Sequence, residues 1–168
     1  MYYINVFIIY SILGYILEAS FSFITKGTFK SGIMIGPWTP IYGIGVIIIL
    51  SLSKFIFKNL HLSKIYEIII TLILITVILT ILEYLGGISI EKLFHKSLWD
   101  YSNQSFHIGK YISLTASLTW AIGSIIIIYI IEPHLKNIIN KIPTSISIIL
   151  LFLFIIDLIY TFIKNIKT

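Results

Sequence analysis

Five long apolar segments dominate the sequence, and they decide what the chain can fold into. A helix needs about 20 apolar residues to cross the hydrocarbon core of a bilayer. Segments of this kind lie at about residues 3–24, 40–57, 65–88, 111–131 and 143–163. Only 11% of the residues are charged, whereas a soluble domain carries roughly 25%. The sequence therefore predicts an all-α integral membrane bundle of five transmembrane helices, forming a single transmembrane domain over residues 1–168.

Two of the connections between these segments are longer than turns. They are loop one, residues 25–39, and loop three, residues 89–110. Loop three opens with ISIEKLFHKSLW, in which the apolar residues fall on one side at helical spacing. This pattern predicts a short interfacial helix in loop three, with Trp99 at headgroup depth. Pro40 is suited to a helix start, and Pro133 and Pro143 are expected to bracket the fourth connection as helix breakers.

The basic residues bear on location and orientation. All 12 are lysine, and they are scattered singly, so we interpret them as membrane-flanking anchors and expect no nucleic-acid partner. With five spans, loops one and three and the C-terminus share one side, here called the loop-1/3 side. Its lysines outnumber those of the other side by 7 to 5, which favours a cytoplasmic loop-1/3 side. The two sets are Lys26, Lys30, Lys92, Lys96, Lys110, Lys164 and Lys167 against Lys54, Lys58, Lys64, Lys136 and Lys141. The richness in Ile, Lys, Asn, Tyr and Phe indicates an AT-rich bacterial genome, and hence the bacterial cytoplasmic membrane.

Three acidic residues lie within the predicted spans: Glu18, Glu83 and Asp157. A charge at the centre of a span costs roughly 2.5–3.5 kcal/mol on insertion scales, so such residues usually face the bundle interior. Each lies late in a span that runs toward the loop-1/3 side. At a rise of 1.5 Å per residue, each is about 8–10 Å inside that boundary. The three acids are therefore predicted to share one layer.

Three spans also carry narrow stripes of small or polar residues at helical spacing. The stripes are Ser11, Gly14, Glu18 and Ser22; Thr76, Thr80, Glu83 and Gly87; and Ser113, Ser117, Trp120 and Ser124. Membrane helices approach closely and hydrogen-bond along such stripes, so they are more often packing seams than substrate paths. For Glu18 and Glu83 a functional role is the favoured interpretation. Asp157 is equally compatible with a buried site and with a snorkelling interfacial ion pair, because Thr161 and Lys164 follow at helical spacing.

Several chemistries lack the residues that they need. The chain has no cysteine, which excludes disulfides and thiolate metal sites. It has no P-loop motif and neither of the G-x-S-x-G and H-E-x-x-H motifs. The acidic and histidine residues of loop three show no fixed metal-ligand spacing. We therefore predict no metal and no cofactor, and no catalytic residue can be assigned.

Several motifs occur in an order that resembles a known family. They are SILGYILE at 11–18, GPWTPIYGIG at 36–45, LEYLGGISIEKLF at 82–94, LWDYS at 98–102 and FHIGK at 106–110. Over roughly residues 11–123 the chain resembles the bacterial family called Putative ABC-transporter type IV, the CmpB-like ABC transporter permeases. That family usually shows an Asn-Arg-Gly-like step where this chain has Lys30, Ser31 and Gly32. It usually has Asn and Arg at the positions of His107 and Lys110, and a lysine keeps the charge but loses the bidentate fork of arginine.

The resemblance implies a transport-related membrane subunit of unknown substrate, with a polar cavity near one membrane face. Residue pattern and resemblance together give these substrate-binding or cavity candidates: Glu18, Tyr42, Glu83, Glu91, Trp99, Asp100, Tyr101 and Lys110. The structural motif residues are Gly14, Gly36, Pro37, Pro40, Gly43 and Gly109.

The implied partners are the lipid bilayer, a separate ATP-binding protein and further copies of the chain, because five spans are few for a pathway. Two alternatives remain open. One is a small intramembrane enzyme that acts on a lipid or lipid-linked substrate, with Glu18 or Glu83 as acid or base. The other is a structural or regulatory membrane subunit.

Overall fold

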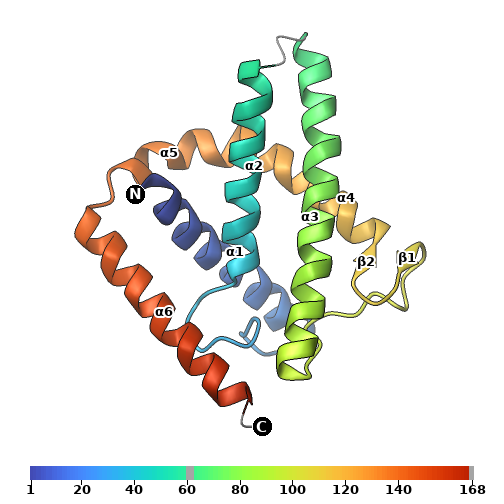
Figure 1. The fold of residues 1–168 in the computed structure, drawn as a ribbon, viewed down its shortest axis with the longest axis vertical. Coiled ribbons are helices and arrows are strands. Elements are labelled where there is room, and N and C mark those ends of the chain that lie inside the picture. Colours follow the sequence, from blue (N-terminus) through green and yellow to red (C-terminus); the bar gives the residue numbers. More distant parts are fainter. Residues whose placement is uncertain (60–62, 167–168) are drawn as a thin grey trace. The chain divides into compact units, whose positions relative to one another are not determined.

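A computed structural model describes residues 1–59 and 63–166, and it consists of helices with one small hairpin (Figure 1). The elements are α1 (Tyr2–Lys26), α2 (Pro40–Asn59), α3 (Lys64–Phe94), β1 (His107–Ile108), β2 (Ile112–Ser113), α4 (Leu114–Ile126), the π-helical segment η1 (Ile127–Ile131), α5 (Glu132–Asn140) and α6 (Thr144–Ile166). Lys167, which enters the charge balance above, lies outside the described residues.

The prediction of five transmembrane helices is confirmed. The helical stretches long and apolar enough to cross a membrane are Tyr2–Lys26, Pro40–Asn59, Lys64–Phe94, Leu114–Asn140 and Thr144–Asn165. The fourth of these combines α4, η1 and α5 in one continuous run. The chain is therefore an all-α, multi-pass membrane protein.

The short interfacial helix predicted in loop three is not a separate element. Its residues up to Phe94 are the last turns of α3, which ends where His95 adopts a left-handed φ of 51° and donates its N–H to Glu91 O. The glycine pair before this segment does not interrupt the helix. Gly87 lies within α3, where it allows the ring of Tyr111 to pack closely against the helix. The amphipathic pattern is real, but it belongs to the end of a long span.

Pro133 does not end the fourth span, contrary to the prediction. The helix passes through it by way of η1, in which the N–H of Glu132 reaches back to Ile127 O, five residues earlier. A π-helical turn of this kind accommodates a proline that offers no N–H of its own. The ring of His134 adds a contact of 2.6 Å between its Nδ1 and Ile130 O. Pro40 is the first residue of α2, as predicted.

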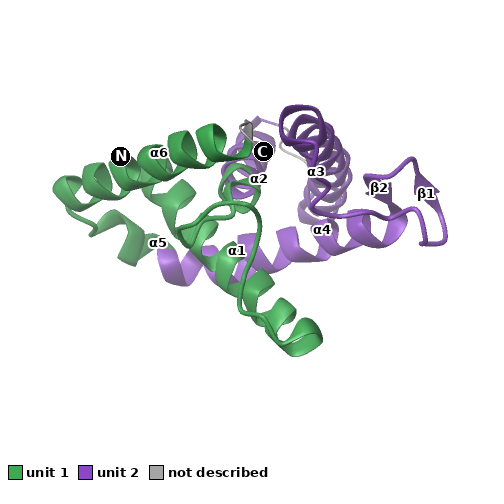
Figure 2. Ribbon diagram, turned by 90° about the horizontal axis from the view of Figure 1, so that it is seen from below, with its two compact units in different colours: residues 1–44, 136–168 green, residues 45–135 purple. Residues whose placement is uncertain are grey.

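The described residues group into two compact units, coloured in Figure 2. Unit 1 contains residues 1–44 and 136–168, and unit 2 contains residues 45–135. Each is described by itself below, and the single transmembrane domain over residues 1–168 stays a prediction.

Unit 1 is built around the first helix and the loop that follows it. Its core contains Ile8 of α1, Met34 and Trp38 of loop one, and Phe154 of α6. The N–H of Thr39 donates to Ser11 O at 3.0 Å, which fixes the end of loop one against α1. The second part of loop one, from Ser31 to Thr39, is therefore packed into the unit, whereas residues 25–30 are exposed.

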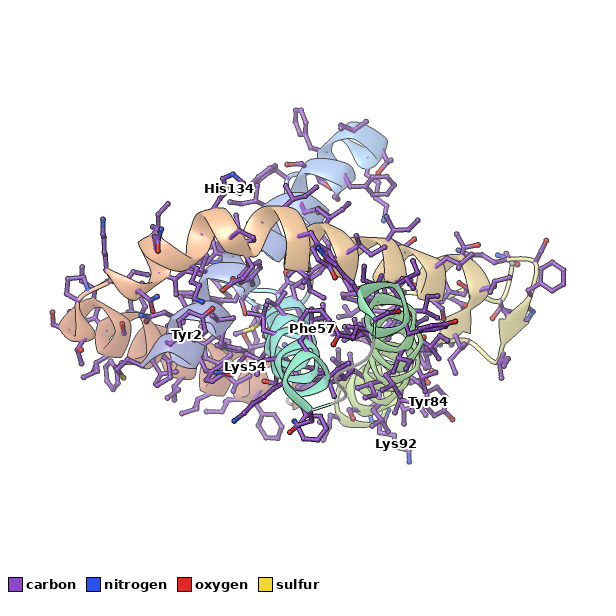
Figure 3. All side chains as sticks on the ribbon, turned by 90° about the horizontal axis from the view of Figure 1, so that it is seen from above. Tyr2, Lys54, Phe57, Tyr84, Lys92 and His134 are labelled. Carbon is purple, nitrogen blue, oxygen red and sulfur yellow. The ribbon has the colours of Figure 1, made fainter. Side chains whose placement is uncertain are left out.

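Unit 2 is built around the packing of α3 against α4. Its core contains Ile49 of α2 with Ile75 and Leu79 of α3, and Trp120 of α4 packs against it. The opposite side of α3 is exposed, and Tyr84 and Lys92 project from it away from α4 (Figure 3). Apolar side chains of α3 such as Ile73, Val77 and Ile81 are exposed as well, which fits contact with lipid.

Loop three contains an element that the sequence did not predict. Strands β1 and β2 pair antiparallel, with His107 opposite Ser113 and Ile108 opposite Ile112. Gly109 occupies the turn with a left-handed φ of 62°, a conformation that glycine adopts without a steric penalty. The hairpin leads directly into α4.

Candidate functional site

The centre of the candidate site is Glu83, a carboxylate on α3 that is only 6% exposed. Its Oε1 accepts a hydrogen bond from the Tyr101 hydroxyl at 2.7 Å. Its Oε2 accepts one from Trp120 Nε1 at 3.1 Å. Three separate elements of unit 2 thus converge on one buried acid: α3, loop three and α4. We call the three residues Glu83, Tyr101 and Trp120 the Glu83 site.

The polar stripes of the third and fourth spans explain why these groups meet. One turn before Glu83, the hydroxyls of Thr80 and Ser117 lie 2.8 Å apart. One turn after it, Gly87 leaves room for the ring of Tyr111. The two stripes therefore face each other as a packing seam, as their composition predicted. Glu83 is the one ionisable residue within that seam.

Loop three is held by local hydrogen bonds that present Tyr101 to Glu83. The N–H of Tyr101 donates to Lys110 O at 2.8 Å, which closes the base of the loop. Asp100 Oδ1 accepts the N–H of Ser102 at 2.9 Å, and these contacts from Ser102 lower the pKa of Asp100. Asp100 is exposed and stabilises a turn, so the structure gives it a positioning role in the loop.

An ion pair ties the hairpin to the end of α3. Lys110 Nζ lies 2.8 Å from Glu91 Oε1, and the two side chains are 33% and 46% exposed. The hydrogen bond to Glu91 raises the pKa of Lys110. The same ammonium lies 5.5 Å from the centroid of the Tyr111 ring, and Trp99 packs edge-on against that ring at 6.0 Å. These contacts form an aromatic and charged rim beside the seam.

Replacing Lys110 by methionine is expected to loosen loop three only slightly, because the ion pair is half exposed and screened by salt. Amide exchange at Tyr101, whose N–H bonds to the backbone of residue 110, should become about twofold faster at low ionic strength. The difference should vanish in high salt. Because the Lys110 pKa is raised, the stabilisation is fully present below the ordinary lysine pKa and is lost as the pH rises through the raised value. A ratio of exchange rates between the variant and the wild type that changes with neither salt nor pH would contradict this role.

Unit 1 holds a second polar cluster around Glu18. The hydroxyl of Ser31 donates to Glu18 Oε2, and Ser31 Oγ lies 3.1 Å from Thr39 Oγ1. Ser31 is 5% exposed, so this chain of groups runs into the interior of the unit.

Two glycines allow close helix contact in the same unit. Gly14 of α1 lies against the ring of Tyr42 of α2. Gly43, next to that tyrosine, lies against Ser11 and the backbone of Phe7. A methyl group has no space at Gly14 or Gly43. Tyr42 therefore contributes to helix packing beside the Glu18 cluster.

The predicted cavity residues are thus divided between the two units. Glu18 and Tyr42 belong to unit 1, whereas Glu83 and Asp100 belong to unit 2. A cavity shared by all four, and one common layer for the three acids, both stay predictions.

Asp157 of α6 holds the backbone of loop one. Its Oδ1 accepts the N–H of Ile35 at 3.2 Å and its Oδ2 accepts the N–H of Gly36 at 2.8 Å. The hydroxyl of Thr161 also donates to Oδ1, at 3.2 Å. Gly36 has no space for a side chain, because Trp38 and this carboxylate occupy it. Asp157 is therefore an anchor for the segment that precedes Pro37.

Replacing Asp157 by alanine is expected to release loop one. Hydrogen bonds to charged groups contribute about 1.5–3 kcal/mol each, which corresponds to roughly a 10- to 100-fold change in local opening. Amide exchange at Ile35 and Gly36 should accelerate by about tenfold or more. Thr161→Val is the matched control, since it removes one donor and leaves both backbone contacts. Equal exchange in the two variants would contradict the anchoring role.

Several residues of these clusters were absent from the list of candidates. Trp120 stood in a predicted stripe, but its reach to Glu83 depends on the register of α4 against α3. Ser31, Thr39 and Tyr111 lie in loops or at helix ends, where sequence spacing carries no information on partners. Because an acid within a span needs polar partners, the side chains of Trp120 and Tyr111, which carry hydrogen-bond donors, could have been considered as candidates. Among residues 1–59 and 63–166, no three acidic or histidine side chains are grouped closely enough to hold a metal ion.

A comparison with protein families identifies a match. The model of the family described as Putative ABC-transporter type IV matches residues 5–162, which is nearly the whole chain. No curated protein and no solved structure matches the chain.

Proposed function

The chain belongs to the family described as Putative ABC-transporter type IV, and we propose that it is the permease subunit of a bacterial transport system. Its family and its five apolar helices already make it a transport-related membrane protein. The permease role is the further step. A chain with no nucleotide-binding motif would need a separate ATP-binding protein for active transport.

The observation that carries this proposal is the Glu83 site. A buried carboxylate within a span costs free energy, and pairing both of its oxygens with donors reduces that cost. Packing alone would be served equally well by an apolar residue on α3. An acid with two dedicated donors, one of them on a loop, is better explained by a function that uses its charge.

The carboxylate retains binding capacity in this arrangement. An ionised carboxylate has about four acceptor positions, and Tyr101 and Trp120 use one on each oxygen. The remaining positions suit a cation, an ammonium group or a hydroxyl of the transported molecule. A cation at the remaining position of Oε1 would weaken the hydrogen bond that Tyr101 donates to the same oxygen, and weakening of that contact would free loop three. Binding at Glu83 would in this way be coupled to movement of the loop.

The loop-1/3 side is the proposed docking side for the ATP-binding protein. The lysine excess favours a cytoplasmic location for it, which is where ATP is available. We further propose that the chain assembles as a homo-oligomer or within a larger complex in the bacterial cytoplasmic membrane, because five spans alone enclose little volume.

The test is isolation of the complex at native abundance. The chromosomal copy is tagged, the cells are cross-linked, and the tagged protein is purified from the membrane fraction. We expect an ATP-binding protein to co-purify in a fixed ratio. ATP hydrolysis by the reconstituted complex should exceed that of the ATP-binding protein alone. Tyr84→Phe, on the exposed side of α3, should leave this stimulation unchanged.

Two results would overturn the proposal. One is a tagged protein that carries no ATPase from the membrane while deletion of the chain alters neither uptake nor export. The other is a lipid conversion by the purified protein that Glu83→Gln abolishes, which would favour the intramembrane-enzyme alternative.

A further inference from the structure

A groove on the surface of unit 2 is not used by the Glu83 site. It has a volume of about 500 Å³ and lies between the segment Gln104–Phe106 and the first turns of α4. Its floor consists of Leu114, Leu118 and Ile122, spaced by one helical turn each, which are 50%, 52% and 60% exposed. These three residues form a straight apolar strip about 12 Å long.

The groove continues a surface that faces lipid. Leu114 begins α4, which opens the fourth span, so an exposed apolar strip on this helix lies against hydrocarbon. Thr119, which also lines the groove, donates its hydroxyl to Thr115 O at 2.9 Å. This satisfies the hydroxyl within the helix, so Thr119 adds no unpaired donor to the strip.

One end of the groove is polar. Gln104 and Ser105 line it beside Phe106, and both are exposed. Within the described ranges, neither side chain has a hydrogen-bonding partner in the protein. The groove is therefore apolar along most of its length and carries amide and hydroxyl groups at one end. A membrane lipid has the same distribution of polarity, because its polar ester groups adjoin its apolar acyl chains.

The wall of the groove has an unusual backbone. Phe106 adopts a left-handed φ of 58°, which a bulky residue rarely does, and its ring is 81% exposed. Its carbonyl accepts the N–H of Leu114 at 3.0 Å, which holds it in this conformation at the base of the hairpin. This hydrogen bond accounts for the backbone conformation, but it leaves the ring of Phe106 with little contact to the rest of the protein. A contact partner outside the chain would give this exposed ring a surface to pack against.

We propose that this groove binds one membrane phospholipid, with an acyl chain along Leu114, Leu118 and Ile122 and the ester region beside Gln104 and Ser105. The ring of Phe106 covers the chain from the side. Contact on several sides distinguishes this lipid from one that lies against a single exposed helix face, where packing is one-sided. This inference stands independently of the permease role.

Native mass spectrometry of the protein extracted from phosphatidylcholine vesicles tests the proposal. The wild type should retain about one lipid per chain after detergent exchange. Leu118→Trp places a bulky ring in the middle of the groove and should lower the retained lipid by about tenfold, equivalent to roughly 1.4 kcal/mol. Ile149→Trp is the matched control, since Ile149 is 58% exposed on α6. It should retain lipid as the wild type does.

A second variant separates lipid binding from folding. Phe106→Gly relieves the strained φ and removes the wall, so the protein should be at least as stable while its retained lipid falls. Equal lipid retention in the wild type, Leu118→Trp and Phe106→Gly would overturn the proposal. A dimer without lipid that Leu118→Trp dissociates would overturn it as well, and would assign the groove to contact between two copies.

Discussion

Replacing Glu83 by alanine is expected to lower the free energy of unfolding by about 2–4 kcal/mol, because it leaves two donors of unit 2 without their acceptor. The Tyr101 hydroxyl and Trp120 Nε1 both donate to this carboxylate. Within a membrane protein, water cannot readily replace the lost partner, so each donor retains most of its desolvation penalty. Denaturant titration in micelles, followed by circular dichroism, measures the change.

Glu67→Ala is the matched control for this substitution. Glu67 lies in the first turn of the same helix, where a carboxylate interacts mainly with the helix dipole. Its removal should therefore cost less than about 1 kcal/mol. If the two variants were equally stable, Glu83 would not organise the contact between α3, α4 and loop three.

Replacing Gly14 by alanine is expected to destabilise unit 1 by about 1–3 kcal/mol, although alanine is normally the better helix former. A Cβ at this position would lie 2.7 Å from the Cβ of Tyr42 and still closer to its ring. The helices α1 and α2 would have to separate, because the clash is with the root of the side chain and not with a flexible end. The same titration measures the change.

Gly123→Ala provides the comparison for Gly14→Ala. Gly123 is also helical, but a Cβ there meets no atom within 4 Å. Alanine should therefore stabilise the protein, by about 0.5–1 kcal/mol, since it reduces the freedom of the unfolded chain. Opposite signs for the two glycines are the expected result. A stabilising effect at both positions would mean that α1 and α2 are not in close contact.

The spans could be predicted because the bilayer sets their length and composition. The elements that the sequence missed depend on local backbone geometry and on contacts between distant residues. A proline usually breaks a helix, but the π-helical turn before Pro133 lets the helix continue without the N–H that proline lacks. The residues after Gly87 have the pattern of an interfacial helix, yet they extend α3 because the ring of Tyr111 covers that glycine.

The acids themselves were also predictable, because a charge in an apolar span has few reasons to be there. Their partners were not. The register of α4 against α3 places Trp120 on Glu83, and the turn around Asp100 brings Tyr101 to the same carboxylate. Asp157 showed the same ambiguity in sequence, and the structure resolves it as the anchor of loop one. Helical spacing shows which residues share a face of a helix, but it does not show which other element packs against that face.

We propose that the charge of Glu83 serves transport in addition to holding α3, α4 and loop three together. The most direct measurement is ATP hydrolysis by the reconstituted complex carrying Glu83→Gln, which keeps the shape of the side chain and one acceptor oxygen. If the site couples cargo to loop movement, stimulated hydrolysis should fall by about 5- to 150-fold, the usual range for a coupling free energy. Wild-type stimulation by a Glu83→Gln complex that remains assembled would contradict the claim and leave Glu83 with a purely structural role.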